Sequence, residues 1–348
     1  MTNNSNQLTP RTTRLSRRRA RFYSSAGATL VALLVTEIVL RVFPTAGIYF
    51  QMRRVVQQYC TRPNVQTQYS NREDFTGNFA TSEFNTAIRI NHQGLRDRER
   101  PYERPDQGKR VLVLGDSFVF GWGVESDQAV SAQLERQLSS VEAINAGCSG
   151  WSTRQEWDFL RVEGIRYRPD LVLLFFCEND PAENDVKYQF LDGSLRLQAD
   201  TDGIKARLRR LLVKNSALCA LAYGAISPLL SRPTGPKVAG KDNSQWQSEA
   251  ELLRAMGEFC QAARTQLAIV YIPLKGPDRR PQPGPYFARL SAVCARLKIP
   301  FLDLAPALLQ SSSTAPVYYR LDDHWTAAGH RAAAEATVAF IRSQSLLR

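Results

Sequence analysis

The chain has 348 residues, enough for one large domain with appendages or two small domains, and we expect the former. Its formal net charge of +12 first suggests a nucleic-acid ligand. About half of that excess, however, belongs to a short N-terminal tail with no acidic residue, and no sequence resembles a base-reading helix or an aromatic and basic platform. We therefore predict no nucleic-acid partner. The arginines of the tail are Arg11, Arg14, Arg17, Arg18, Arg19 and Arg21.

The basic tail, residues 1–23, is followed by an apolar segment, residues 24–43, which reads SSAGATLVALLVTEIVLRVF. About 20 such residues cross a bilayer as a helix, and a basic flank stays on the cytoplasmic side. Glu37 and Arg41 lie four residues apart, so they can pair on one helical face. We predict an uncleaved, single-pass transmembrane anchor with the rest of the chain outside the cytoplasm. The alternative is a cleaved signal peptide, with Thr45-Ala46-Gly47 as a poor cleavage site.

The six cysteines lack the close pairing of a zinc site, because no C-x-x-C motif occurs. We predict no metal. Cys148, Cys177 and Cys294 lie in apolar runs and are expected to pack as small hydrophobes, although export would allow one disulfide.

Residues 44–109 are polar and poorly periodic, and we expect an extracytoplasmic segment that packs on the main domain. From residue 110 onward, short apolar runs alternate with helix-like stretches, which predicts an α/β fold with a mostly parallel five-stranded sheet covered by helices on both faces. Functional sites in such folds form at the carboxyl ends of strands. The five predicted strands are 111–114, 143–146, 171–176, 267–272 and 301–304.

An insertion at about residues 181–245 interrupts this pattern. It contains a predicted hairpin around Leu191-Asp192-Gly193, a basic-then-apolar stretch over 204–230 and a loop over 231–243. The 204–230 stretch is either an interfacial helix or lid that holds the domain against the membrane, or an ordinary amphipathic helix on the core. Its apolar run is too short for a second membrane span.

Ser117 lies where the first strand should hand over to a helix, within RVLVLGDSFVFGWGV. A hydroxyl held at such a turn, beside free backbone N–H groups, suits nucleophilic attack on an acyl carbon. The competing interpretation is that Asp116 and Ser117 cap a helix.

A serine nucleophile needs a base, and the chain has only three histidines. We favour His324, because Asp322 and Asp323 precede it and one of them could orient its ring. His330 lies six residues further along the predicted last helix and is expected to be structural. The competing interpretations of the Asp-Asp-His cluster are a metal site and a helix cap.

The sequence resembles the SGNH, or GDSL-type, esterase and acyltransferase superfamily, whose fold is a three-layer α/β/α sandwich. Four blocks in the family's order carry the resemblance: GDSFVFGWG, INAGCSG, CEND and DDHW. It implies that Ser117 is the nucleophile and His324 the base. It also implies an oxyanion hole formed by the Ser117 N–H, the Gly147 N–H and the Asn179 side-chain amide.

Two positions depart from the superfamily pattern. Cys177 stands where the asparagine block usually opens with glycine. Leu321 occupies the position, three residues before the histidine, that usually holds the acid. The D-x-H-W spacing is similar to that of membrane-anchored members and of the alginate O-acetylation branch, which implies Asp322 as the acid, with Asp323 as the alternative.

Together these features predict a membrane-anchored serine esterase of a bacterial inner membrane, with its catalytic domain at 110–348 in the periplasm or otherwise outside the cytoplasm. The partner would be an ester-bearing small molecule, glycan or lipid, and no cofactor is expected. Two alternatives stay open: an O-acyltransferase that uses the same acyl-serine on an exported polysaccharide, and a non-catalytic envelope or glycan-binding protein that keeps the fold.

Overall fold

The computed structural model describes residues 13–43, 60–104, 108–191, 194–197, 208, 211–213, 215–230 and 243–347. The chain forms two compact units. The first comprises residues 1–53 and 204–230, and the second comprises residues 54–203 and 231–348.

The first unit contains the long helix α1 (Thr13–Val42), which covers the predicted apolar segment and continues back into the basic tail. Within the described residues, Arg21–Val42 is the one stretch of helix long and apolar enough to cross a membrane. At 1.5 Å per residue its 22 residues rise by about 33 Å, close to the ~30 Å of a bilayer's hydrocarbon layer. Residues 1–12 and the weak cleavage site at 45–47 lie outside the described residues. The same unit contains helix α9 (Ala217–Leu230).

The second unit is built on a five-stranded parallel sheet with the spatial order β13-β10-β7-β5-β6. This confirms the five predicted strands. Within this sheet the chain first forms β5, continues to β6 at the edge and then crosses to β7 on the other side of β5, so the direction of winding reverses between β5 and β7. Ligands of open α/β sheets bind at such a reversal, outside the carboxyl ends of the strands. The strands are β5 (Lys109–Gly115), β6 (Val141–Gly147), β7 (Leu171–Phe176), β10 (Gln266–Tyr271) and β13 (Phe301–Asp303).

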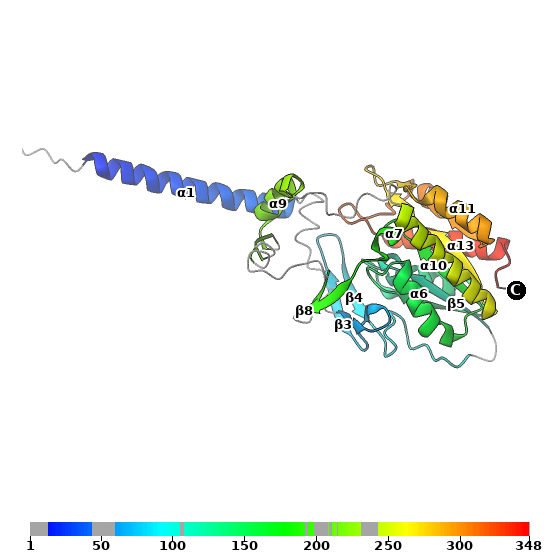
Figure 1. Cartoon of the computed structure of the whole chain (residues 1–348). Coiled ribbons are helices and arrows are strands. Elements are labelled where there is room, and N and C mark those ends of the chain that lie inside the picture. The colour runs from blue at the N-terminus through cyan, green and yellow to red at the C-terminus, as the bar shows by residue number, and fades with distance from the viewer. Residues whose placement is uncertain are drawn as a thin grey trace, which may run out of the picture. The chain divides into compact units, whose positions relative to one another are not determined.

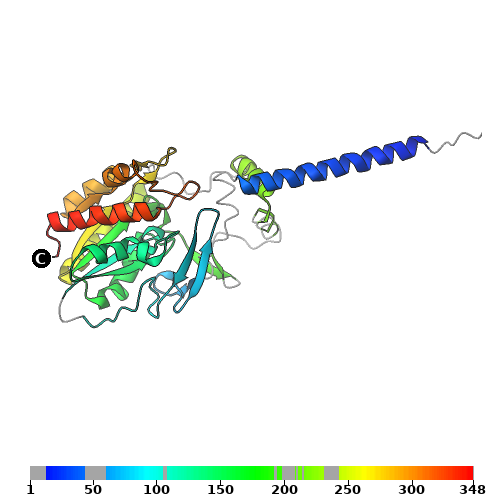
Figure 2. The ribbon, with the colours of Figure 1, turned by 180° about the vertical axis from the view of Figure 1, so that it is seen from behind.

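Helices cover both faces of the sheet, which confirms the predicted three layers (Figures 1 and 2). Side chains alternate along a strand, so Val111 and Val113 join one apolar core whereas Leu112 and Leu114 join the other. The first core packs against α5 (Val130–Gln137), α12 (Ala305–Ser311) and α13 (Ala327–Ser343). The second packs against α6 (Thr153–Val162), α10 (Asn243–Ala262) and α11 (Phe287–Leu297).

Residues 60–104 are an integral part of the second unit. They form two hairpins, β1 (Thr61–Asn64) with β2 (Gln68–Asn71) and β3 (Thr76–Ala80) with β4 (Asn85–Arg89). Phe79 and Ile88 pack against Phe120 and Trp122, which follow the candidate nucleophile. The buried Arg96 guanidinium donates to the carbonyls of Phe120 and Val124 and so fixes the turn between them.

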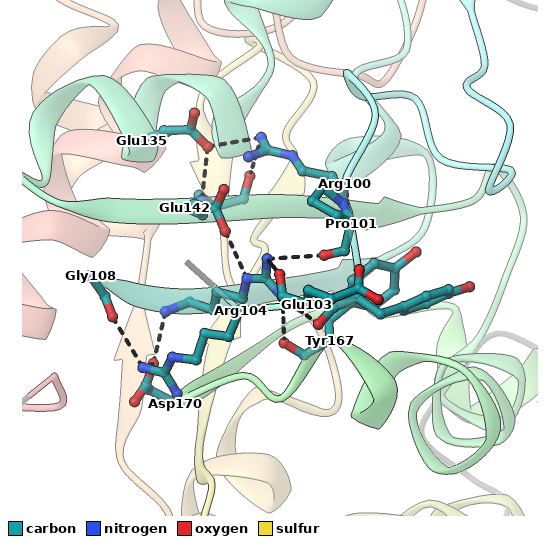
Figure 3. A network of polar contacts seen from close by, with 12 residues as sticks. Arg100, Pro101, Glu103, Arg104, Gly108, Glu135, Glu142, Tyr167 and Asp170 are labelled. Carbon is teal, nitrogen blue, oxygen red and sulfur yellow. Dashed lines mark hydrogen bonds and ion pairs between the residues drawn. The ribbon is translucent and has the colours of Figure 1, made fainter. Parts of the chain in front are cut away.

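A polar network ties the segment before β5 to the amino ends of the strands (Figure 3). Arg110, at the start of β5, is 1% exposed and donates to the carbonyls of Pro101 and Glu103 and to the Glu142 carboxylate. Asp170, just before β7, accepts from Arg104 at 2.7 Å and from the Arg110 N–H at 2.8 Å. The network lies at the end of the sheet opposite the carboxyl ends of the strands, so it stabilises the domain away from the candidate site.

The described parts of the insertion include the predicted hairpin, formed by β8 (Tyr188–Leu191) and β9 (Ser194–Leu197). Its turn residues, 192 and 193, and the loop over 231–242 lie outside the described residues. Further short elements among the described residues are two strands, β11 (Leu274–Lys275) and β12 (Pro281–Gln282), two helices of four residues, α4 (Ser117–Phe120) and α7 (Asp180–Glu183), and two 3₁₀ helices, Ser126–Gln128 and Gly164–Tyr167. All six cysteines are free thiols, and every one except Cys219 is buried.

Candidate active site

Ser117 is the first residue of α4, directly after β5 ends at Gly115. Asp116 is the helix cap, because its Oδ1 accepts the Phe118 N–H at 2.9 Å. The cap therefore does not occupy the serine hydroxyl. The helix ends after one turn at Gly121, whose φ of +84° favours glycine. Ser117 is partly exposed whereas its neighbours from Arg110 to Val124 are buried, so it is the residue of this stretch that reaches the surface.

His324 lies beside Ser117, with its Nε2 atom 2.6 Å from the serine Oγ. Its ring also packs against Phe118 and Trp122, at centroid distances of 5.0 and 5.6 Å. His324 precedes the last helix, α13, rather than lying in its first turn, and the cap of that helix is Thr326. The helix-cap interpretation of Asp322 and Asp323 is therefore wrong.

The two aspartates before His324 have different surroundings. Asp322 is fully buried, and its carboxylate contacts His324 Nδ1 through Oδ1 while Oδ2 accepts from Trp122 Nε1 at 3.4 Å. The Asp323 side chain is 67% exposed and pairs with Lys275 at 3.1 Å. The geometry therefore places Asp322, and not Asp323, behind the imidazole.

The other two histidines, His330 and His92, have different surroundings. His330 is buried and packs edge-on against Trp325, and burial lowers its pKa to about 3. A neutral, packed imidazole agrees with the structural role expected for it. His92 is exposed and lies 3.2 Å from Asp74. Among the described residues, no group of three His, Cys, Asp or Glu side chains is arranged to hold a metal ion.

The structure contradicts the expectation that the Gly147 N–H is an oxyanion donor. That N–H already donates to Asn145 Oδ1 at 3.0 Å, so it is not available to a substrate. Glycine is required at 147 for another reason: a Cβ there would lie 2.2 Å from the Phe120 N atom. Gly147 thus allows β6 and α4 to approach closely, which holds the Ser117 turn in place.

The loop after β6 offers a different amide. The Cys148 N–H donates to the Gly115 carbonyl and the Trp151 N–H to the Cys148 carbonyl, so both are occupied. Gly150, with a φ of +79°, has an N–H without an acceptor among the residues that the structure describes. The sequence block INAGCSG contains both Gly147 and Gly150. They are distinguished as candidate donors by the Gly147 N–H, which is already bonded to Asn145.

Asn179 follows β7 in a tight turn closed by Asp180. The Asp180 carboxylate accepts the Cys177 N–H at 2.9 Å, and the Asp180 N–H donates to the Cys177 carbonyl at 3.1 Å. Asn179 is partly exposed between two buried acids, and its side chain hydrogen-bonds Glu183. Cys177, at the position of the usual glycine, is buried, which raises the pKa of its thiol well above the ordinary value and keeps it neutral.

Three fully buried carboxyl groups, from Glu156, Asp180 and Glu249, lie behind the Asn179 turn. Burial raises the pKa of all three, and repulsion from nearby carboxylates, Asp116 and Glu249 among them, adds to the effect for Glu156 and Asp180. The pKa of Glu249 is raised to about 7, although hydrogen bonds to Asn184 and Thr153 oppose the shift.

This burial predicts a pH dependence of stability. Between pH 4.5 and about 7 folded Glu249 keeps a proton that the unfolded chain releases, so the free energy of unfolding falls as pH rises, by up to about 3 kcal/mol. Glu249→Gln removes this titration. Between pH 5 and pH 8 the free energy of unfolding should therefore fall less for the variant than for the wild type. Urea unfolding at the two pH values measures this. Exposed Glu251 on the same helix is the control, and an E249Q slope equal to that of E251Q would contradict the prediction.

The close approach at Gly147 predicts a second stability effect. Gly147→Ala should destabilise the fold by about 3 kcal/mol, because its new methyl group would meet backbone atoms of α4 that cannot move aside. Gly257→Ala in α10 is the control, since a Cβ there meets only Ile299 at 3.5 Å, and alanine should be neutral or slightly stabilising. Equal urea midpoints for the two variants would refute the steric argument.

A doubly covered parallel sheet with a serine, a histidine and a buried carboxylate in sequential contact at its carboxyl edge defines the class of α/β serine hydrolases. Comparison with known families agrees: the profile of the GDSL-like lipase/acylhydrolase family matches residues 113–332. The chain belongs to the GDSL-like lipase/acylhydrolase family.

Solved structures that the chain is similar to include the lipase/acylhydrolase from Enterococcus faecalis, at 17% identity and a TM-score of 0.41, covering 68% of this chain and 96% of that one. The psychrotrophic esterase EstA from Pseudoalteromonas sp. is similar at 13% identity and a TM-score of 0.41, covering 68% and 98%. A G-D-S-L family lipolytic protein from Veillonella parvula DSM 2008 is similar at 12% identity and a TM-score of 0.42, covering 67% and 97%. No curated protein matches the chain.

Proposed function

We propose that the chain is a membrane-anchored esterase that cleaves carboxylic esters through an acyl-serine at Ser117. The observation that carries this proposal is the continuous contact from Ser117 Oγ to His324 Nε2 and from His324 Nδ1 to the buried Asp322 carboxylate. In this arrangement His324 is the general base and Asp322 holds the imidazole in the orientation that accepts the serine proton.

The proposed reaction has two halves. His324 takes the proton from Ser117 as its oxygen attacks the ester carbonyl, and then gives that proton to the departing alcohol. Water, deprotonated by the same imidazole, attacks the acyl-serine, and the imidazolium returns that proton to the departing Ser117 oxygen as the carboxylic acid is released. Asp322 stabilises the imidazolium in both halves.

We assign the oxyanion hole to the N–H groups of Ser117 and Gly150 and to the Asn179 side-chain amide, which carries two N–H groups and can therefore serve an oxyanion while it is bonded to Glu183. Gly150 replaces Gly147 because the Gly147 amide is engaged by Asn145. Ser117 and Asn179 support the assignment because each is the partly exposed residue in an otherwise buried strand end, and because β5 and β7 are neighbours in the sheet.

The assignment of Asn179 predicts a moderate loss of activity on mutation. Asn179→Ala should lower kcat by about 10²- to 10³-fold, because one donor to the developing negative charge is lost while attack by the serine remains. Steady-state hydrolysis of a short aryl ester measures this. An unchanged KM with the lowered kcat is expected, and a kcat within a factor of two of the wild type would remove Asn179 from the oxyanion hole.

The setting of the reaction follows from α1. We infer that the Arg21–Val42 stretch is a single-pass anchor in a bacterial inner membrane, with the arginine-rich end in the cytoplasm and the hydrolase domain in the periplasm. An enzyme held there meets the esters of envelope glycans and lipids, so we propose an O-acylated envelope carbohydrate or lipid as substrate. The same acyl-serine could pass its acyl group to a sugar hydroxyl instead of water.

A covalent probe tests the proposed chemistry. The full-length protein, in detergent, should react with a fluorophosphonate, and mass spectrometry should place the adduct on Ser117. Ser117→Ala should not be labelled. Comparison of acetyl release from isolated envelope polysaccharide by the wild type and by Ser117→Ala then tests the substrate class. Absence of labelling in a folded wild type would favour a non-catalytic binding protein.

A further inference from the structure

Glu37, near the C-terminal end of α1, caps the N-terminus of helix α9. Its carboxylate accepts the N–H groups of Ala217 and Leu218 at 2.9 and 3.0 Å and the Ser216 hydroxyl at 3.0 Å. The same carboxylate accepts from Arg41 at 2.8 Å, and Arg41 also donates to the Asn215 carbonyl. Both charged residues of the apolar segment are thus bonded to the start of α9.

These contacts satisfy two kinds of polar group that water would otherwise have to solvate. The first N–H groups of a helix have no partner within it, and an ionised carboxylate in an apolar medium is costly. Glu37 lies five residues before α1 ends, about 7 to 8 Å along the axis, so within a bilayer it would sit below the outer edge of the hydrocarbon layer. There the carboxylate and the helix start satisfy each other.

Both the face of α9 that packs on α1 and its exposed face are apolar. One face packs Ala217 and Ala220, each at most 1% exposed, near Leu40 of α1. Small residues at a helix–helix contact let two helices approach closely in membranes. On the other side Leu221 is 43% exposed, and Leu211 and Leu212 just before α9 are 60% and 48% exposed. No charged residue occurs from Ser216 to Leu230.

We propose that α9 is embedded in the outer layer of the bilayer beside α1, with lipid acyl chains as the partner of Leu221 and of the exposed Leu211 and Leu212 just before the helix. At 14 residues it rises by about 21 Å, too short to cross the ~30 Å hydrocarbon layer, so it enters without spanning. The insertion would then give the hydrolase domain a second attachment to the membrane. This proposal rests on the proposed anchor, and it favours the interfacial interpretation of residues 204–230 over a helix packed on the core.

Cys219 provides a native position for the test, because it is the one cysteine of the chain that is not buried. The full-length protein would be spin-labelled at Cys219 and reconstituted into phosphatidylethanolamine and phosphatidylglycerol vesicles. Relaxation by oxygen, which dissolves in lipid, is compared with relaxation by a water-soluble nickel chelate. Two reference labels are made in a Cys219→Ser background: Val35→Cys on exposed α1 and Ser313→Cys on an exposed loop of the hydrolase domain.

We expect the Cys219 label to respond to oxygen several-fold more than to nickel, as the Val35→Cys label should, and the Ser313→Cys label to do the reverse. A Cys219 label that behaves like Ser313→Cys, with Val35→Cys in lipid, would overturn the proposal and leave the anchor intact. Nickel access at Val35→Cys would overturn the anchor as well. Dipolar broadening between Cys219 labels would mean that a second copy covers this face, which also overturns the proposal.

Glu37→Ala tests the contact that holds α9. Losing the carboxylate should raise the nickel response at Cys219 several-fold while a label at Val35→Cys stays in lipid. Thr36→Ala is the matched control, because the Thr36 hydroxyl bonds only within α1, to the Ala32 carbonyl. An equal response in the two variants would show that Glu37 does not position α9.

Discussion

Replacing His324 by alanine is expected to lower kcat for a short aryl ester by about 10⁴- to 10⁶-fold and to leave KM within a few-fold. His324 Nε2 lies 2.6 Å from the Ser117 hydroxyl, and among the residues that the structure describes no second base contacts that hydroxyl, so in the variant the serine proton is left to water. Because the imidazole acts on the reacting oxygen and not on substrate binding, the effect should fall on kcat. Steady-state kinetics of the full-length protein in detergent measures it.

Two further variants test whether the loss belongs to the proposed serine–histidine pair. Ser117→Ala should reduce kcat by a similar factor, and the double variant should be no worse than either single one, because the two residues act as a unit. His92→Ala, which alters an exposed histidine paired with Asp74, should keep full activity. Normal turnover by both His324→Ala and Ser117→Ala would exclude the proposed mechanism.

The sheet and the serine–histidine pair could be predicted from the sequence because local patterns encode them. A parallel strand covered on both faces is a continuous apolar run, such as 171–176, so all five strands could be recognised one at a time. Three histidines in the whole chain left few choices of base, and the structure brings the favoured one, His324, into contact with Ser117.

What the sequence could not provide depends on contacts between distant segments. Gly147 and Gly150 are alike in sequence, and only the position of the Asn145 amide shows that the first N–H is occupied. The role of residues 60–104 was also hidden, because Arg96 reaches the turn after Ser117 across more than twenty residues. Similarly, nothing near Glu37 in the sequence indicates that it caps a helix 180 residues away.

The choice between the two adjacent aspartates yields the second large effect. Asp322→Asn should lower kcat by about 10⁴-fold, because an amide can donate to His324 Nδ1 and so favours the tautomer that cannot accept the serine proton. Asp323→Asn should stay within a few-fold of the wild type, since that side chain faces solvent and Lys275. The pair is a stringent comparison: the substitutions are chemically identical and one residue apart, and they differ in burial and in contact with the imidazole. Circular dichroism of both variants guards against misfolding, and the kcat values of the two, measured on the same ester, decide the acid. The opposite ranking would transfer the role to Asp323 and would require the His324 loop to rearrange when substrate binds.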